Sequence, residues 1–471
     1  MRGFLASFPS SIGAPSLVAS SIGVTCAAAL ALPMALPAAA APSTPSATAV
    51  PFPGGAISAS AEPAVAGSTR SLPLVPLSPD RVLGTAPEQG LYRADIERFS
   101  LVGVVWDDPD TELHGRVQVR TRSAATGRWS GWQDVETHNA DHGADPGTAE
   151  RTSRRVHGAT APLWVGDSDG VDVRVRADTA SARGSSSGGP RAVLPSGLRL
   201  ELVDPGDGEP PEDAPVDAPP RTGLYTDAAI AASATNTDIT HIGATEIPAL
   251  GQWDTERELG LLRGSVGAKP YIGPRPRIVT RRGWGADESL RESGFVYTKK
   301  VKAAFVHHTA SGNRYTCSQA PSVIRSIYRY HVKSMGWRDI GYNFLIDKCG
   351  TIYEGRAGGV TKAVQGAHTL GFNANSMGIA VIGSFGVSKP PGAAVTAIAK
   401  LTAWKLGLYG ANPRGKTYLT SGGGNLYPKG RNVRLNVISG HRDGFATECP
   451  GKSLYARLGT ARANAARYQG R

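Results

Sequence analysis

The sequence predicts two folded parts in one chain: an all-β domain, and after it an α/β domain with a central mixed sheet flanked by helices. The length of 471 residues exceeds what one hydrophobic core usually organises. Residues 91–205 alternate apolar and polar side chains with a period of two, which is typical of strands. Residues 276–468 alternate short apolar runs with segments of helical period, which favours a sheet covered by helices.

The first 41 residues have the pattern of a signal peptide. Arg2 is their only charged residue, an apolar run spans residues 24–36, and small residues at 38–41 suit a cleavage site. No later apolar stretch approaches the roughly 18 residues that a membrane span needs. We therefore expect a secreted, extracellular protein without a stable membrane anchor.

Two segments have the composition of connectors. Residues 42–90 are rich in Ala, Pro, Ser and Gly, and we expect a disordered tether there that builds no core. Residues 206–275 begin as a proline-rich acidic stretch and continue without a clean period. A linker with at most one short helix is expected there.

Between these connectors, residues 91–205 are predicted to form a β-sandwich or jelly-roll accessory domain. The strands expected from the alternation are residues 99–106, 116–120, 171–176 and 198–202.

The α/β domain is expected to place a buried strand before a histidine. The apolar run at residues 303–306 ends at His307, and a helix is predicted from Pro321. The remaining predicted elements are strands at residues 342–346, 377–382 and 433–438, and helices at 395–408 and 454–468. The last strand would deliver His441.

The net charge of +12 favours polyanionic surroundings, such as an acidic cell wall. The Lys and Arg residues are scattered and never form a run long enough for a nucleic-acid patch. We therefore expect no nucleic acid among the partners.

His441 and Cys449, eight residues apart, offer two ligands to one divalent metal. His307 or His308, more than 130 residues earlier, could supply the third ligand on spacing alone. Three protein ligands leave a fourth position open for water, as in catalytic zinc sites, whereas structural sites close the shell with four.

The cysteines support this expectation. Cys26 would leave with the signal peptide, so an odd number of cysteines would remain in an oxidising compartment. Cys317 and Cys349 flank one helix–strand unit and are predicted to form a disulfide. Cys449 would then be free for a metal, although its pairing with either of the other two stays open.

Five motifs carry a resemblance to a known family. They are Phe305-Val306-His307-His308-Thr309-Ala310, Gly336 to Phe344, Tyr353-Glu354-Gly355-Arg356, Gly366-Ala367-His368-Thr369, and Gly440-His441-Arg442-Asp443 with Thr447 to Gly451. In this order they resemble the peptidoglycan recognition proteins and their zinc-dependent N-acetylmuramoyl-L-alanine amidase relatives. The resemblance covers about residues 276–468 and implies that fold for the second domain. The first half resembles, more weakly, an accessory β-module that precedes such domains in actinobacterial proteins.

The resemblance also implies roles for individual residues. One Zn²⁺ per chain would be held by His307, His441 and Cys449. Tyr342 matches the catalytic tyrosine, and Thr447 matches a hydroxyl near the metal that could stabilise an oxyanion. The positions that face the peptide and sugar of the substrate are matched by four further residues: His308, which is not a ligand in the family, Arg356, His368 and Asn373.

These observations favour a secreted, cell-wall-associated amidase, a monomer that binds peptidoglycan. It would hydrolyse the amide between the lactyl group of N-acetylmuramic acid and L-alanine. A non-catalytic peptidoglycan receptor is the alternative, and retention of Cys449 speaks for the enzyme. A third hypothesis, a purely structural zinc, would be supported by a fourth protein ligand in place of water.

Overall fold

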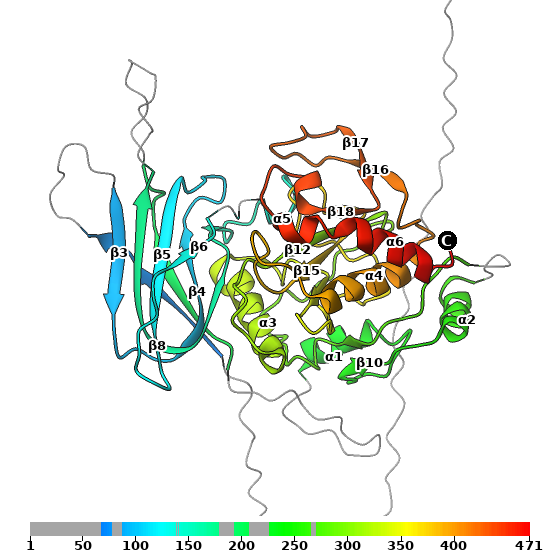
Figure 1. Cartoon of the computed structure of the whole chain (residues 1–471), viewed down its shortest axis with the longest axis horizontal. Helices are drawn as coiled ribbons and strands as arrows, with labels where there is room; N and C mark the ends of the chain where they lie inside the picture. The colour runs from blue at the N-terminus through cyan, green and yellow to red at the C-terminus, as the bar shows by residue number, and fades with distance from the viewer. Residues whose placement is uncertain are drawn as a thin grey trace, which may run out of the picture. The chain divides into compact units, whose positions relative to one another are not determined.

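The computed structural model describes residues 67–77, 87–137, 139, 141–178, 193–206, 226–264 and 270–471. The expected signal peptide at residues 1–41 lies outside the described residues. Two larger sheets form, one in each predicted domain, and both fold classes are as expected (Figure 1). No helix among the described residues is both long and apolar enough to cross a membrane.

The first domain is all-β. Its described strands form one antiparallel network with the path β1-β9-β4-β8-β3-β2, to which β5, β6 and β7 add. The strands are β1 (Ser68–Pro73), β2 (Val75–Pro76), β3 (Glu88–Arg93), β4 (Phe99–Trp106), β5 (Gly115–Ser123), β6 (Gln133–Val135), β7 (Gly158–Ala159), β8 (Leu163–Ala177) and β9 (Arg199–Asp204).

The expected tether at residues 42–90 was wrong where the structure describes that segment. Strand β1 pairs along its whole length with β9, and Leu74 is buried in the core of the β domain. Pairing with a strand more than 100 residues away overrides the weak local signal of a Pro- and Ser-rich segment.

The second domain has a seven-stranded mixed sheet in the order β10-β11-β14-β13-β15-β12-β18. The strands are β10 (Glu246–Ile247), β11 (Ile278–Val279), β12 (Ala303–His308), β13 (Phe344–Ile346), β14 (Ile352–Glu354), β15 (Ser376–Val381) and β18 (Ile438–Gly440). The helices are α1 (Asp227–Ala234), α2 (Gln252–Arg263), α3 (Ala320–Arg329), α4 (Gly392–Gly407), α5 (Lys452–Tyr455) and α6 (Leu458–Tyr468). Short helical turns cover Cys317–Gln319 (η1), Tyr330–Ser334 (η2) and His441–Asp443 (η3).

The linker prediction for residues 206–275 was also wrong in part. Helices α1 and α2 form within this segment, and β10 joins the edge of the mixed sheet through β11. Thr226 caps α1 by accepting a hydrogen bond from Ala229 N–H at 3.2 Å, a local signal that a proline-rich composition obscures.

The predicted strand at residues 433–438 is divided. Strand β17 (Asn432–Asn436) pairs with β16 (Lys416–Thr420) in a separate two-stranded sheet, and only β18 joins the central sheet. Val433 and Leu435 pack in a small separate core, whereas Ile438 packs in the main core, so burial in two different places explains the division.

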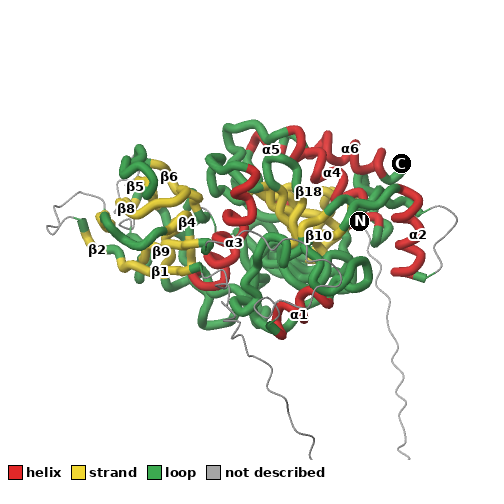
Figure 2. The backbone as a smooth tube through the Cα atoms, turned by 90° about the horizontal axis from the view of Figure 1, so that it is seen from below, coloured by secondary structure: helices red, strands yellow, loops and turns green. Residues whose placement is uncertain are grey.

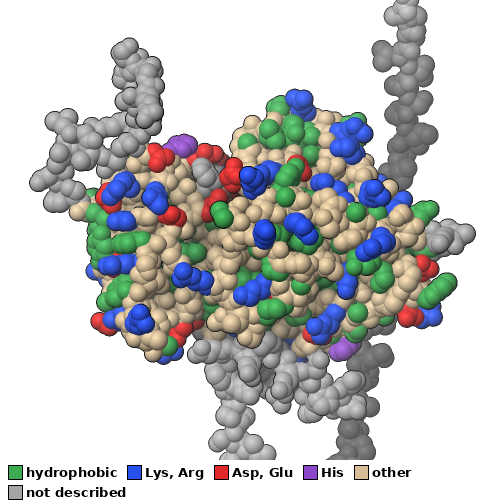
Figure 3. All heavy atoms as spheres, in the orientation of Figure 1, with side chains coloured by type: hydrophobic (Ala, Val, Ile, Leu, Met, Phe, Trp, Pro, Cys, Tyr) green, Lys and Arg blue, Asp and Glu red, His purple; other side chains and the backbone are tan. Residues whose placement is uncertain are grey.

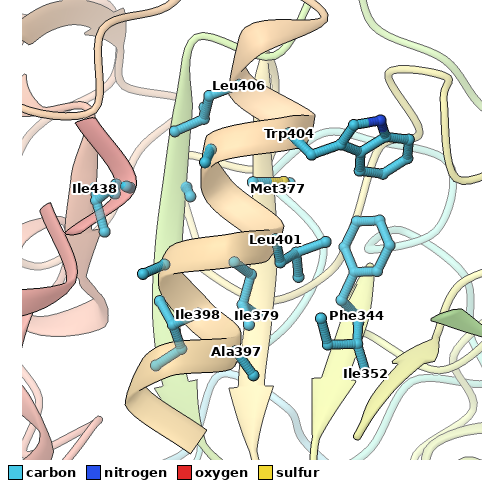
Figure 4. Close-up of a cluster of buried hydrophobic side chains, with 14 of the residues drawn as sticks. Phe344, Ile352, Met377, Ile379, Ala397, Ile398, Leu401, Trp404, Leu406 and Ile438 are labelled. Carbon is cyan, nitrogen blue, oxygen red and sulfur yellow. The ribbon is translucent and has the colours of Figure 1, made fainter. Parts of the chain in front are cut away.

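Helices α4 and α6 lie side by side next to β18 (Figure 2) and cover one face of the mixed sheet. Figure 4 shows the core beneath α4, where Ile398 and Leu401 meet Ile379 and Phe344. Burial of such side chains contributes roughly 1.5–3 kcal/mol each.

The opposite face of the mixed sheet shares its core with the β domain. Ala380 of β15 and Ile327 of α3 belong to the same buried cluster as Leu101 and Val105 of β4. Tyr330 donates a hydrogen bond to the carbonyl of Thr160 at 3.0 Å across the same boundary. Segments of the β domain are thereby fixed against the α/β domain.

Candidate metal centre

Parallel pairing brings the two predicted histidine ligands together. Strands β12 and β18 run parallel, with Val306 opposite Gly440. Their carboxyl ends therefore deliver His307 and His441 at the same edge of the sheet, with ring centroids 4.5 Å apart. The Arg442 N–H donates to the carbonyl of Cys449 at 3.1 Å, so the turn after His441 folds back and carries Cys449 to the same place.

Four side chains converge there. The Cys449 thiol lies 3.7 Å from His307 Nδ1 and 4.0 Å from Nε2 of His142, a residue of the β domain. One donor atom from each of His142, His307, His441 and Cys449 lies within 4.8 Å of the other three. Donors of a tetrahedral zinc site with ordinary bond lengths stand about 3.5 Å apart, so this group fits one such ion with small adjustments.

The chemistry of the donors also fits a cation. Neither ring nitrogen of the fully buried His441 has a hydrogen-bond partner among the described residues, and a metal would satisfy one of these two buried polar atoms. Burial lowers the pKa of His441 to about 3 and that of His307 well below its usual value, so both imidazoles are neutral, as ligands must be. Burial and the nearby Asp141 carboxylate raise the pKa of the Cys449 thiol, so ionisation needs the positive charge that a metal supplies.

Tyr342 and Thr447 border this group. The Tyr342 ring lies 5.5 Å from that of His307. Burial, and to a smaller extent the nearby Cys449, raises the pKa of the Tyr342 hydroxyl well above its usual value. Tyr342 therefore stays protonated and can donate a hydrogen bond. Thr447 Oγ1 accepts a hydrogen bond from Cys449 N–H at 3.1 Å.

His308 stands outside the group of four donors. Its Nδ1 accepts a hydrogen bond from Phe385 N–H at 3.3 Å, and burial lowers its pKa to about 4. Of the two histidines that spacing left open, the structure places His307 with Cys449 and His441.

The three other residues predicted to meet substrate are buried, and two of them contact the β domain. Arg356 donates to both carboxylate oxygens of Glu150 at 2.9 Å. Asn373 Nδ2 donates to the carboxylate of Asp145 at 2.6 Å and to the carbonyl of Gly143 at 2.8 Å.

His368 Nδ1 lies 3.0 Å from Thr369 Oγ1, and the His368 ring lies 5.2 Å from that of His307.

Sequence reasoning missed the acidic residues and His142 that reach these positions from the β domain. They lie between β6 and β7, and we call residues 141–157 of this segment the β6–β7 loop. Long loops inside compact domains are often functional, and the length of this segment is a signal that could have drawn attention to His142.

Cys317 and Cys349 form the expected disulfide, with Cα atoms 6.2 Å apart, and Cys449 is the free cysteine of the described residues. This excludes the alternative pairings of Cys449 in this structure. The bridge ties the turn before α3 to the turn between β13 and β14, close to the strand that follows Tyr342.

Comparison with known proteins agrees with the geometry. A family model described as N-acetylmuramoyl-L-alanine amidase matches residues 297–452, and one described as Rv3811 N-terminal galactose-binding domain-like matches residues 56–193. Peptidoglycan-recognition protein SC2 of Drosophila simulans is 31% identical over 183 residues, which cover 39% of this chain and 85% of that protein. Peptidoglycan-recognition protein SC1a of Drosophila melanogaster is 30% identical over 201 residues, covering 43% of this chain and 94% of that protein.

Among solved structures, Drosophila PGRP-LB is 27% identical to this chain, with a TM-score of 0.31. The alignment covers 39% of this chain and 92% of the PGRP-LB chain. The mixed sheet, its helices and the matching family model define a domain of the amidase type 2 class, with three candidate metal ligands at the strand ends. The chain belongs to the peptidoglycan recognition protein family, and its all-β domain is galactose-binding-like.

Lys and Arg side chains are spread over the face of the molecule in Figure 3 and do not gather in one patch there. This distribution agrees with the scatter expected from the sequence.

Proposed function

We propose that this protein is a secreted, zinc-dependent N-acetylmuramoyl-L-alanine amidase that acts at the cell wall. It would hydrolyse the amide between the lactyl group of N-acetylmuramic acid and the L-alanine of the stem peptide. The observation that carries the proposal is the convergence of His307, His441 and Cys449 beside the protonated hydroxyl of Tyr342. Membership of a family that contains amidases supports it.

In this proposal His307, His441 and Cys449 hold one zinc ion, which supplies Lewis-acid chemistry at the scissile amide. The Tyr342 hydroxyl donates a hydrogen bond to the oxygen on which negative charge develops, and such a donor is worth roughly 3 kcal/mol of transition-state stabilisation. Thr447 is the second donor. Its hydroxyl lies on the turn that also carries Cys449, so the two keep a fixed relation.

Substrate recognition is assigned to Arg356, His368, Asn373 and His308. A guanidinium accepts a carboxylate in the two-pronged geometry that Arg356 makes with Glu150, and a stem-peptide carboxylate offers the same oxygens. Peptidoglycan is therefore the proposed partner of these four residues.

A second candidate function has a specific observation in its favour. His142 lies where a fourth ligand would complete the shell, and a four-ligand zinc is characteristic of structural sites. A protein with such a zinc could bind peptidoglycan without cleaving it.

The experiment that separates the two uses purified protein with one zinc per chain, tested as wild type and as His142→Ala. We expect the His142→Ala variant, with or without the wild type, to release stem peptides that have a free L-alanine amino group. Chelation should stop this release, and added zinc should restore it. Cys449→Ala in the same variant should lose both zinc and activity. Binding of peptidoglycan without release in any zinc-loaded form would instead establish the receptor.

A further inference from the structure

The β6–β7 loop reaches into the candidate site with side chains that the β domain itself does not use. Asp145 accepts hydrogen bonds from Gly371 N–H at 2.8 Å and from the Asn373 side chain. Glu150 accepts hydrogen bonds from Arg338 N–H at 3.2 Å and from the Arg356 guanidinium. All these partners belong to the α/β domain. Asp145 is buried and the Glu150 side chain is 8% exposed, so both carboxylates would be costly to retain without such partners.

The loop is also anchored in the core. Ala144 and Val156 are buried in the cluster that contains Trp337 and Tyr342. The backbone N–H of His157 donates to the carbonyl of Met335 at 3.1 Å, and Leu370 N–H donates to the carbonyl of Asp141 at 3.0 Å. These contacts fix the loop at both of its ends and over its middle.

His142 lies between the anchors. Its Nδ1 is 2.9 Å from the carboxylate of Asp141, which orients the ring so that Nε2 faces the Cys449 thiol. A carboxylate that holds the far nitrogen of an imidazole is the usual support of a metal-bound histidine. The ring is 8% exposed, so it is enclosed by the site and not merely close to it.

We propose that the β6–β7 loop keeps the site latent: His142 takes the fourth metal position, and Glu150 stands in for a substrate carboxylate at Arg356. The inference rests on the proposed function and adds its regulation. With four protein ligands no position remains for water, and while the loop is closed Glu150 and Asp145 occupy the Arg356 and Asn373 groups that a stem peptide would use. Displacement of the loop exposes the three-ligand site and both recognition residues at once.

Stem peptide therefore competes with the loop for the site. Its apparent affinity is reduced by the fraction of molecules in which the loop is closed. Muramyl peptide bound at high concentration would hold the loop open, which gives an enzyme that responds to dense wall material. No covalent change is needed for activation.

The first test is X-ray absorption spectroscopy at the zinc edge of the full chain. The wild type should show three imidazoles and one sulfur around zinc, and His142→Ala should show two imidazoles, one sulfur and an oxygen. Two imidazoles and an oxygen in the wild type would overturn the proposal. This reading of the wild type does not depend on whether any variant folds.

The second test measures binding of a soluble muramyl tripeptide to zinc-loaded His142→Ala/Glu150→Gln. We expect about tenfold tighter binding or more than in the wild type. His114→Ala and Glu112→Gln, at exposed positions of the same domain, are matched controls that should bind as the wild type does. Equal affinity of the double variant and the wild type would overturn the proposal.

The two proposals fail in different ways. If the double variant binds muramyl peptide more tightly but releases no stem peptide, the latent state is supported and the proposed amidase activity is rejected. If the wild type releases stem peptide as fast as the double variant does, the amidase activity is supported and the proposed latent state is rejected.

Discussion

Arg356 and Glu150 form a buried ion pair in which the guanidinium donates to both carboxylate oxygens at 2.9 Å. The pair joins the residue predicted to meet substrate to a loop of the β domain. The side chain of Arg356 is 4% exposed and that of Glu150 is 8% exposed, so the pair is shielded from solvent.

Glu150→Ala should destabilise the folded protein, because it leaves the buried guanidinium of Arg356 without its charge partner. We expect a loss of about 3 kcal/mol in the free energy of unfolding. Equilibrium urea unfolding of the variant checks this, with Glu112→Ala at an exposed position as the control. A loss no greater than that of the control would mean that the pair contributes nothing to closure.

Tyr342→Phe should lower the rate of amide hydrolysis by roughly 10²-fold and leave the zinc content unchanged, because the ring stays and only the donor is lost. The comparison is made in the His142→Ala protein, where the fourth position is open. Tyr418→Phe is the control, since Tyr418 is 53% exposed. Zinc loss in Tyr342→Phe would show that the hydroxyl supports the metal site and does not serve the reaction alone.

Replacement of both Cys317 and Cys349 by serine should lower the free energy of unfolding by about 3–4 kcal/mol, the value expected for a bridge that closes a loop of this length. Denaturation with and without reductant gives the same quantity for the wild type. Because Cys449 is not part of the bridge, zinc binding should survive in the folded variant. An unchanged denaturation midpoint would contradict the structural role of the disulfide.

Glu354 gives the protein a pH-dependent stability. Burial raises the pKa of its carboxyl to about 7, although Asn236 and Arg281 oppose the shift. The folded state thus holds this proton more tightly than the unfolded chain. The contribution is complete below about pH 4.5 and is lost as the pH rises through about 7, amounting to about 3 kcal/mol.

Glu354→Gln, which mimics the protonated form, should remove this dependence. The free energy of unfolding of the wild type, minus that of the variant, should fall between pH 4.5 and 7. A difference that stays constant over that range would show that Glu354 does not titrate there.

The candidate metal ligands of the α/β domain could be predicted from the sequence because local patterns mark them. The apolar run of β12 ends at His307, and His441 and Cys449 share one short turn. What the sequence could not show is that β12 and β18 are neighbours, since pairing between distant strands leaves no local trace.

His142 was missed because it lies in the other domain. A histidine in a polar loop is ordinarily solvated, and its neighbours Asp141 and Asp145 look like a surface charge cluster. The packing of β4 against α3, together with the loop's own contacts to the α/β domain, brings this loop to the strand ends. The errors at β1 and α1 have a similar origin, since long-range pairing and capping outweigh composition.

The most direct test of the proposed amidase is mass spectrometry of peptidoglycan fragments after incubation with zinc-loaded His142→Ala/Glu150→Gln protein. The account predicts free stem peptides that begin with L-alanine, together with glycan that has lost them, and neither product when Cys449→Ala is added to the same protein. Intact muropeptides after incubation with the folded protein carrying one zinc per chain would contradict it.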